Sequence, residues 1–482
     1  MQNFEDVIKE DCFYVDKTPF IEDIEESNKY FFYIRPRRFG KSLTLSMLEN
    51  YYDINKKEDF ETIFGGLYIG ENPTSEHNTY LVIHLNFAEV DSGLDNYKEG
   101  LDTHCRLVFE DFCTRYAALL PKGTKEELKS EQGAIAQLRF LCQKCTEVKQ
   151  KIYLFIDEYD NFTNMILSSE EHLERYKGQT HGEGYLRRFF NTIKGAANTS
   201  LDRIFVTGVS PVTMDDLTSG FNIGTNYSLA PEFNEMTGFT EEEVREMLSY
   251  YAGVLPFNHT VDELIEIMKP WFDNYCFAIN SYGKTTMYNS IMVLNFVDNY
   301  IRNDYHIPNK MVETNIRIDY SKIRMLIRHD KEFAHDASII QELVTKGYTT
   351  GNLVENFPAD RINDPDNFLS LLFYFGLVTI DGEYKGSTKF IIPNEVVRDQ
   401  IYTYLLDTYR ENDLTFEQYD KNKLESRLAY DGDFRPYFDY IADCLKRYSS
   451  QRDKQKGEAY VHGFTLAMTS QCKFYRPISE LD

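Results

Sequence analysis

The chain has 482 residues, a length that accommodates roughly two to four domains with large hydrophobic cores. Its formal net charge of −25 argues against bulk, sequence-independent binding of nucleic acid, because counterion release requires a basic surface, although it does not exclude a local basic groove. We find no signal peptide and no apolar run of membrane-spanning length, so we expect a soluble, cytoplasmic protein with no membrane partner.

The first predicted element is a strand over residues 30–34, followed by a polar loop and a helix over residues 43–52. Gly40, Lys41 and Ser42 stand where this loop meets the helix, as in a phosphate-binding loop. Backbone N–H groups there can surround a phosphate, and the helix dipole favours its negative charge. We expect Lys41 to reach the β- and γ-phosphates of a nucleotide and the Ser42 hydroxyl to ligate Mg²⁺. The expected nucleotide-binding residues are Pro36, Arg37, Arg38, Phe39, Gly40, Lys41, Ser42 and Leu43.

Arg35 makes this loop a variant, because the pattern G-x-x-x-x-G-K-[ST] has its first glycine at that position. Arg35, Arg37 and Arg38 would crowd three cations beside Lys41, and a bound triphosphate would relieve their repulsion. Phosphate contact by Arg37 or Arg38 is one interpretation, and ion pairing with the acidic cluster at 157–160 is the other. We expect Phe39 to pack under the loop.

A second buried strand is predicted over residues 80–87, and a lone C-x-x-C, Cys142 to Cys145, follows on a predicted helix. Neither a second cysteine pair nor a histidine cluster lies near it in the sequence. Ordinary, partly buried thiols are therefore favoured over a zinc or redox site.

The apolar run over residues 151–156 predicts a strand buried inside a parallel sheet, and it ends in Asp157 and Glu158. The carboxyl ends of such strands are where α/β sheets place their ligands. We expect Asp157 to hold Mg²⁺ through water and Glu158 to polarise an attacking water. A solvated acidic turn is the alternative, but the order and spacing of this pair and the Gly-Lys-Ser loop favour the catalytic interpretation.

A helix over residues 185–197 and a strand over residues 203–210 continue the alternation of helices and strands. We therefore predict an α/β fold with a P-loop NTPase sheet of parallel strands sandwiched by helices. Thr207 or Ser210, polar residues late in that strand, would lie beside the γ-phosphate and sense it; for Thr207 a purely structural role is the alternative. Residues 168–184 are predicted to form an exposed loop that could cover the nucleotide.

Beyond the sheet, Thr240 is predicted to cap a helix that begins at Glu241 and opens a helical lid over residues 241–303. Residues 304–430 mix helices with strand signals at 371–380 and 389–392, which indicates a mostly helical, winged-helix-like region. A winged helix usually suggests DNA contact, but we favour packing on the nucleotide-binding core.

Motifs in one order over most of the first 300 residues resemble those of the bacterial and archaeal AAA-ATPase-like family. They include Tyr14-Val15-Asp16-Lys17-Thr18, Arg35-Pro36-Arg37-Arg38-Phe39-Gly40-Lys41-Ser42, Leu154-Phe155-Ile156-Asp157-Glu158-Tyr159-Asp160, Thr207-Gly208-Val209-Ser210-Pro211 and Thr237-Gly238-Phe239-Thr240. Asn274 stands where the family has a glycine, and asparagine tolerates the positive φ of such a turn. The resemblance implies a P-loop ATPase with an extra catalytic glutamate over residues 1–240. It also implies a nuclease-like domain of the PD-(D/E)XK type, of which residues 431–482 would be a truncated start without nuclease activity.

Two functions remain open on the sequence. The first is a Mg²⁺-dependent ATPase that hydrolyses ATP slowly and acts as a switch, with Lys41, Glu158 and Thr207 as catalytic residues and Ser42 and Asp157 as metal ligands. The second is a nucleotide-binding interaction module, or remnant of an ATP-regulated nuclease, that hydrolyses little. Arg187, Arg188 and Arg203 are candidates for an arginine finger, and a solvated charge on a helix or at a strand end is the alternative for each. A protein partner or a second copy would otherwise supply the arginine. Nucleic acid stays an undecided partner.

Overall fold

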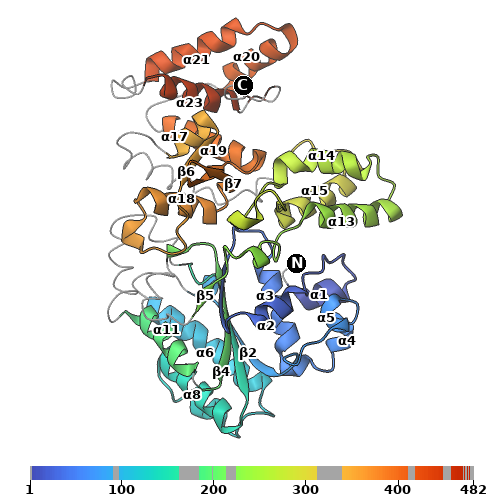
Figure 1. The fold of residues 1–482 in the computed structure, drawn as a ribbon, viewed down its shortest axis with the longest axis vertical. Coiled ribbons are helices and arrows are strands. Elements are labelled where there is room, and N and C mark those ends of the chain that lie inside the picture. Colours follow the sequence, from blue (N-terminus) through green and yellow to red (C-terminus); the bar gives the residue numbers. More distant parts are fainter. Residues whose placement is uncertain are drawn as a thin grey trace.

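The computed structural model describes residues 3–90, 97–161, 184–197, 199–212, 224–311, 339–410, 418–448 and 457–470, together with residues 472, 475 and 477. Most of the predicted loop over residues 168–184 therefore lies outside the described residues. Within them, five parallel strands form a sheet in the order β2-β3-β4-β1-β5, in the lower half of Figure 1. They are β1 (Tyr30–Ile34), β2 (Tyr80–Asn86), β3 (Lys151–Asp157), β4 (Leu201–Gly208) and β5 (Thr225–Asn226). The predicted parallel α/β sheet is confirmed.

The register of the sheet brings the carboxyl ends of neighbouring strands to one edge. Ile34 at the end of β1 pairs with Gly208 at the end of β4, and Asn86 of β2 pairs with Asp157 of β3. β4 starts and ends two residues earlier than the sequence predicts. The loops that follow β1, β3 and β4 thus leave the sheet at the same edge, where ligands bind in α/β folds.

Side chains alternate along the strands, so the sheet has two different cores. On one face, aliphatic residues such as Ile83, Leu154 and Ile204 pack against α6, α8 and α11. On the other face, aromatic residues such as Phe155 and Phe205 pack against α1 to α5. Figure 1 shows the two groups of helices on opposite sides of the sheet. The helices are α1 (Phe4–Lys9), α2 (Phe20–Glu26), α3 (Lys41–Tyr52), α4 (Phe60–Phe64), α5 (Tyr68–Glu71), α6 (Tyr97–Arg115), α7 (Thr124–Leu128), α8 (Gly133–Glu147) and α11 (Tyr185–Ala196).

A helical lid follows the sheet and has its own apolar core, which includes Met247, Leu264 and Phe296. It consists of α13 (Glu241–Val254), α14 (Val261–Phe272) and α15 (Ser290–Arg302). Thr240 caps α13 as predicted, in a capping box with Glu243. Asn274 has a φ of 78°, which confirms the predicted positive φ in the turn after α14.

The next unit has the element order of a winged helix: α17 (Ile339–Lys346), β6 (Tyr348–Gly351), α18 (Pro365–Tyr374), and the hairpin of β7 (Thr379–Tyr384) and β8 (Ser387–Ile391). The strand predicted over residues 371–380 is wrong at its start, because residues 365–374 form a helix. Residues 367–374 are all buried, and a helix buried on most sides gives the same continuous apolar run as a buried strand. The strand predicted at 389–392 is confirmed as part of β8.

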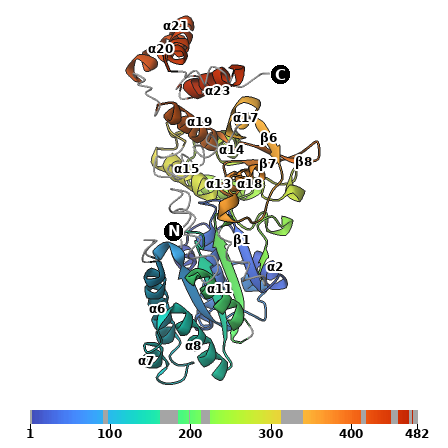
Figure 2. The same cartoon turned by 90° about the vertical axis from the view of Figure 1, so that its left-hand side faces the viewer.

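The winged-helix-like unit packs on the domain of the parallel sheet, as predicted. Phe373 of α18 contacts the ring of Phe277, and the turn after α18 meets the loop that follows β1. Because α18 is buried, its side chains cannot enter a DNA groove in this arrangement. Beyond it lie α19 (Glu395–Arg410), α20 (Gln418–Asp431), α21 (Arg435–Tyr448) and α23 (Gly457–Ser470), with α20, α21 and α23 at the end of the molecule opposite the sheet in Figure 2.

Candidate nucleotide-binding site

The loop between β1 and α3 has the backbone of a phosphate-binding turn. Arg38 and Gly40 have φ values of 70° and 94°, in the left-handed region, and Gly40 directly precedes α3. Glycine reaches such a φ without steric cost. Gly40, Lys41 and Ser42 line the pocket, so the N-terminus of α3, where the helix dipole favours an anion, lies at its edge.

Lys41 lies in the first turn of α3, and its ammonium group is drawn back to the loop. Its Nζ donates to the carbonyl oxygens of Arg35 and Pro36 at 3.1 and 3.2 Å. Burial lowers the pKa of Lys41, while Glu158, Asp157 and Asp160 act in the opposite direction. A buried ammonium held by neutral carbonyls gains strongly from a nearby anion.

The two predicted motifs meet at the carboxyl edge of the sheet. The Ser42 hydroxyl donates to Oδ2 of Asp157 at 2.9 Å, across 115 residues of sequence. The other carboxylate oxygen of Asp157 accepts the N–H of Glu158 at 2.8 Å. Burial and the neighbouring Glu158 raise the pKa of Asp157. A cation bound beside this carboxylate would lower that pKa again.

Glu158 has a φ of 50°, in the left-handed region that a long L-side chain rarely adopts. Such a backbone costs about 1–3 kcal/mol and persists where surrounding contacts determine it. Here the N–H of Tyr159 donates to the carbonyl of Thr207, and Asp160 accepts the N–H groups of Val209 and Ser210. The turn after β3 is thereby fixed on β4, with Glu158 at the wall of the pocket.

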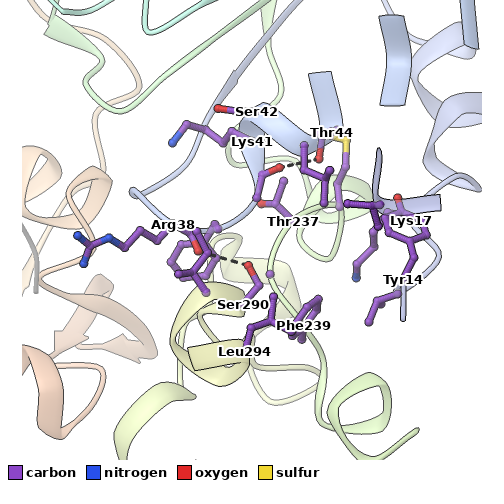
Figure 3. Close-up of a pocket in the computed structure, with 18 of the residues that line it drawn as sticks. Tyr14, Lys17, Arg38, Lys41, Ser42, Thr44, Thr237, Phe239, Ser290 and Leu294 are labelled. Atoms are coloured by element: carbon purple, nitrogen blue, oxygen red, sulfur yellow. Dashed lines mark hydrogen bonds between the residues drawn. The ribbon is translucent and has the colours of Figure 1, made fainter. Parts of the chain in front are cut away.

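The pocket has a volume of about 470 Å³, within the range of ligand sites. Figure 3 shows Lys41 and Ser42 at one end, with Phe239, Ser290 and Leu294 at the other. The second end is lined by residues to which the sequence analysis assigned no role. They are Val7, Phe13, Tyr14, Val15, Met236, Phe239, Met247, Tyr251, Ile291 and Leu294. This apolar end lies between the N-terminal segment and the lid.

Lys17 joins the N-terminal segment to the lid. Its Nζ donates to the carbonyl of Glu235 at 2.8 Å and to the carboxylate of Glu243 at 2.5 Å, the residue that also completes the cap of α13. Asp16 holds the next turn by accepting the N–H and hydroxyl of Thr18. The Tyr-Val-Asp-Lys-Thr motif in the sequence marks this wall of the pocket, but the sequence alone does not show what these residues contact.

Four residues do not lie where the sequence analysis places them. Thr207 is fully buried and its hydroxyl donates to the carbonyl of Tyr33 at 2.7 Å, so it serves the sheet and does not line the pocket. Ser210 is also fully buried. Arg203 forms an ion pair with Glu76 near the start of β4, at the opposite edge of the sheet. Arg35 turns into the interior and is not part of a cationic cluster beside Lys41.

The remaining predicted loop residues surround the pocket. Phe39 is 1% exposed and packs edge-on against the rings of Tyr275 and Phe277, which confirms that it packs under the loop. Arg37 and Arg38 both line the pocket, and Figure 3 shows Arg38 on the side of the loop away from Tyr14 and Lys17. Phosphate contact by either guanidinium stays a prediction. Pro36 packs behind the loop, against the turn after α18.

The donor set fits Mg²⁺ and a triphosphate. Hydroxyl and carboxylate oxygens are the ligands that Mg²⁺ prefers, and in nucleotide sites it takes one or two protein groups with phosphate oxygens and water. Ser42 and Asp157 supply that number. Cys142 and Cys145, by contrast, are buried free thiols, and the described residues contain no cluster of three or more His, Cys, Asp or Glu side chains fit to hold a metal ion.

The fold is that of the P-loop NTPases: a parallel sheet in which the β1–α3 turn and the end of β3 meet at one edge, where α/β folds bind ligands. Residues 1–218 match the model of the AAA-ATPase-like family, described as "Predicted AAA-ATPase", which confirms the resemblance over that part of the chain. The match supports a nucleotide-binding ATPase. Over the part of the chain that is described, no helix is both long and apolar enough to cross a membrane.

The chain is also similar to an "Uncharacterized protein in vnfD 5'region" of Azotobacter chroococcum mcd 1, with 26% identity over 266 residues. The alignment covers 55% of this chain and 45% of that protein, so it spans less than half of the relative. Among solved structures, Cdc6p from Pyrobaculum aerophilum matches with 12% identity and a TM-score of 0.31, over 79% of this chain and 88% of that one. The Aeropyrum pernix ORC2 protein (ADPNP-ADP complexes) matches with 11% identity and a TM-score of 0.34, over 81% and 93%. Likenesses this distant carry no argument about function.

Proposed function

We propose that this chain binds ATP with Mg²⁺, hydrolyses it slowly, and acts as a nucleotide-dependent switch. The observation that carries the proposal is the hydrogen bond between Ser42 and Asp157, beside the buried ammonium of Lys41. Lys41 would bind the β- and γ-phosphates, and Ser42 and Asp157 would hold Mg²⁺, which neutralises charge that develops on the phosphates. Glu158, on the same pocket wall, would orient and polarise the attacking water.

The apolar end of the pocket is the proposed site of the nucleotide base. Tyr14 and Val15 from the N-terminal segment line it together with Met247, Ile291 and Leu294 from the lid. Burial of a flat ring system between apolar side chains supplies binding free energy without demanding a particular hydrogen-bond pattern. A base held there would join two modules that Lys17 already links through Glu243.

The switch role follows from the contacts on the back of the phosphate loop. The carbonyl of Arg38 accepts the Ser290 hydroxyl at 3.3 Å, and the carbonyl of Phe39 accepts the N–H of Gly238 at 2.9 Å. Both donors belong to the lid or to the segment that leads into it. A shift of the loop on binding phosphate would therefore change the contacts of the lid, which is how a ligand shifts a two-state equilibrium.

Slow hydrolysis is proposed because none of the three arginines that the sequence offers as a cis finger lines the pocket formed by the described residues. The described arginines that line the pocket are Arg37 and Arg38, so Arg187, Arg188 and Arg203 do not reach it. An arginine supplied by a partner or second copy can raise the rate by about 10³–10⁵. Measuring phosphate release with and without DNA or RNA would show whether nucleic acid is a partner. We expect no nuclease activity. The assignment of residues 431–482 as the start of a nuclease-like domain stays a prediction.

The proposal is tested with Glu158→Gln, which keeps the size of the side chain and removes the charge that polarises water. We expect the variant to bind MgATP with affinity close to that of the wild type and to lose nearly all phosphate release in a single-turnover assay. Glu126→Gln, an exposed surface change on α7, is the matched control and should hydrolyse normally. If Glu158→Gln leaves the rate unchanged, the chain is a binding module and hydrolysis at this site is refuted.

A further inference from the structure

Arg35 occupies the place of the first glycine in the phosphate-loop pattern, yet its side chain points away from the phosphate site. It is 1% exposed, and its guanidinium lies between the rings of Tyr33 and Phe277, 4.3 Å from each ring centre. The guanidinium donates to the carbonyls of Ile34 at 3.1 Å and Phe233 at 2.9 Å, and also to that of Ser228. Arg35 thus connects β1 to two segments far along the chain.

Burial of the Arg35 guanidinium costs free energy unless its hydrogen bonds and ring contacts are maintained. Burial lowers the pKa of the Arg35 guanidinium, and the groups that oppose this are Tyr33, Tyr374 and Cys276, with no carboxylate among them. Its Nε has no hydrogen-bond partner among the described residues. Neutral carbonyls and two aromatic faces stabilise the charge in place of an anion. Moving the guanidinium away from any of them would expose a buried cation to an apolar core.

The backbone of Arg35 is part of the phosphate loop itself. Its N–H donates to the carbonyl of Gly208 at the end of β4, and its carbonyl accepts the Lys41 ammonium. The next carbonyl, that of Pro36, accepts the same ammonium. Behind Pro36 lies Gly376, with a φ of 75°; a Cβ at that position would lie 2.9 Å from the Pro36 Cβ. The main chain that places Lys41 is therefore held from behind by Arg35 and by the turn after α18.

We propose that Arg35 is a positioning residue of the nucleotide site: its side-chain anchor on Phe277, Ser228 and Phe233 fixes the start of the phosphate loop, the task that a tight glycine turn performs in the general pattern. The inference rests on the proposed nucleotide binding by Lys41. It assigns a function to a residue that touches no ligand, and it makes the nucleotide site dependent on the segment between α14 and α15.

Arg35→Gly tests this directly, because it restores the general G-x-x-x-x-G-K-S pattern while removing the anchor. Calorimetry with MgATP, well below the melting temperature of each variant, measures the affinity of folded protein. We expect the affinity to fall at least about tenfold, since the loss of one hydrogen bond between the Lys41 ammonium and a phosphate oxygen has about that effect. Phe277→Leu removes one face of the anchor and should weaken binding in the same direction by less.

The matched control is Phe189→Leu on α11, a buried aromatic residue that does not line the pocket. It should lower the melting temperature and leave MgATP affinity unchanged, which separates positioning from core packing. Binding by Arg35→Gly as tight as that of the wild type would overturn the inference while leaving the proposed function intact. If Arg35→Gly does not fold, Phe277→Leu is the deciding variant. Unchanged MgATP affinity in Phe277→Leu would then overturn the inference. Failure of the wild type itself to bind MgATP would instead refute the proposed function.

Discussion

The Ser42 hydroxyl donates to the Asp157 carboxylate at 2.9 Å, which joins the first turn of α3 to the end of β3. In the proposed site these two oxygens would share one Mg²⁺. Asp157→Asn keeps the shape and removes the charge, so MgATP should bind with about the affinity of metal-free ATP. Titration of ATP with Mg²⁺ or with a chelator checks this, and Asp111→Asn on the surface of α6 is the control. A full Mg²⁺ enhancement in Asp157→Asn would contradict the assignment of the metal site.

Cys12 provides an independent probe of the apolar end of the pocket. Cys12 is exposed and lines the pocket, as does Tyr251. Cys142 is buried, and burial raises the pKa of the Cys142 thiol to about 11. A disulfide reagent should therefore modify Cys12 quickly and Cys142 slowly, because the thiolate is the reactive form. Saturating MgATP should slow modification of Cys12 several-fold and leave Cys472, which does not line the pocket, unchanged. Equal rates at Cys12 with and without nucleotide would place the base elsewhere.

Asp160 holds the turn that carries Glu158. Its carboxylate accepts the N–H of Val209 at 3.1 Å and that of Ser210 at 2.7 Å, and it is buried. Asp160→Ala would leave two buried donors unsatisfied, at a cost of about 2–4 kcal/mol in the free energy of unfolding. We also expect a lower rate of phosphate release, because Glu158 would lose its fixed position. Denaturant unfolding and a phosphate assay measure both, and an Asp160→Ala protein of wild-type stability would show that this contact does not hold the turn.

Acid sensitivity should arise at the opposite edge of the sheet. Burial raises the pKa of Glu76, but hydrogen bonds from Arg203 and Tyr80 outweigh it and lower that pKa below its ordinary value of 4.5. A carboxylate of this kind contributes stability that is present above its unfolded pKa and is lost as the pH falls through the lower folded pKa. Glu76→Gln should thus reduce stability by about 1–3 kcal/mol near neutral pH and flatten its decline below about pH 5.

Denaturant midpoints at several pH values measure this effect. Glu58→Gln changes an exposed glutamate and should leave both the midpoint and its pH dependence unchanged. If the denaturant midpoint of Glu76→Gln falls as steeply below about pH 5 as that of the wild type, other carboxylates cause the acid sensitivity.

The sheet and the polar end of the site were predictable because their signals are local. Continuous apolar runs predicted β1, β2 and β3, and Gly40-Lys41-Ser42 predicted the loop and α3. Parallel strands end at one edge, so proximity of Ser42 and Asp157 followed from their places after β1 and β3. No distant partner was needed for these inferences.

The sequence-based predictions fail where contacts with distant segments determine the position of a side chain. The direction of Arg35 depends on Phe277 and Ser228, some 200 residues further on, and Thr207 is taken up by the carbonyl of Tyr33 on the neighbouring strand. The apolar end of the pocket combines residues 7–17, 236–251 and 291–294, and each of these segments resembles ordinary core sequence. The end of helix α18, residues 371–374, is predicted as strand because burial on nearly all sides removes the period that distinguishes helices from strands.

The central claim is that a nucleoside triphosphate binds at Lys41, and isothermal titration of the wild-type protein with ATP and Mg²⁺ tests it most directly. We predict saturable heat of association that is lost in Lys41→Ala, because that change removes the buried ammonium while leaving Ser42 and Asp157 in place. Absence of heat with both ATP and GTP, or undiminished binding by Lys41→Ala, would contradict the account.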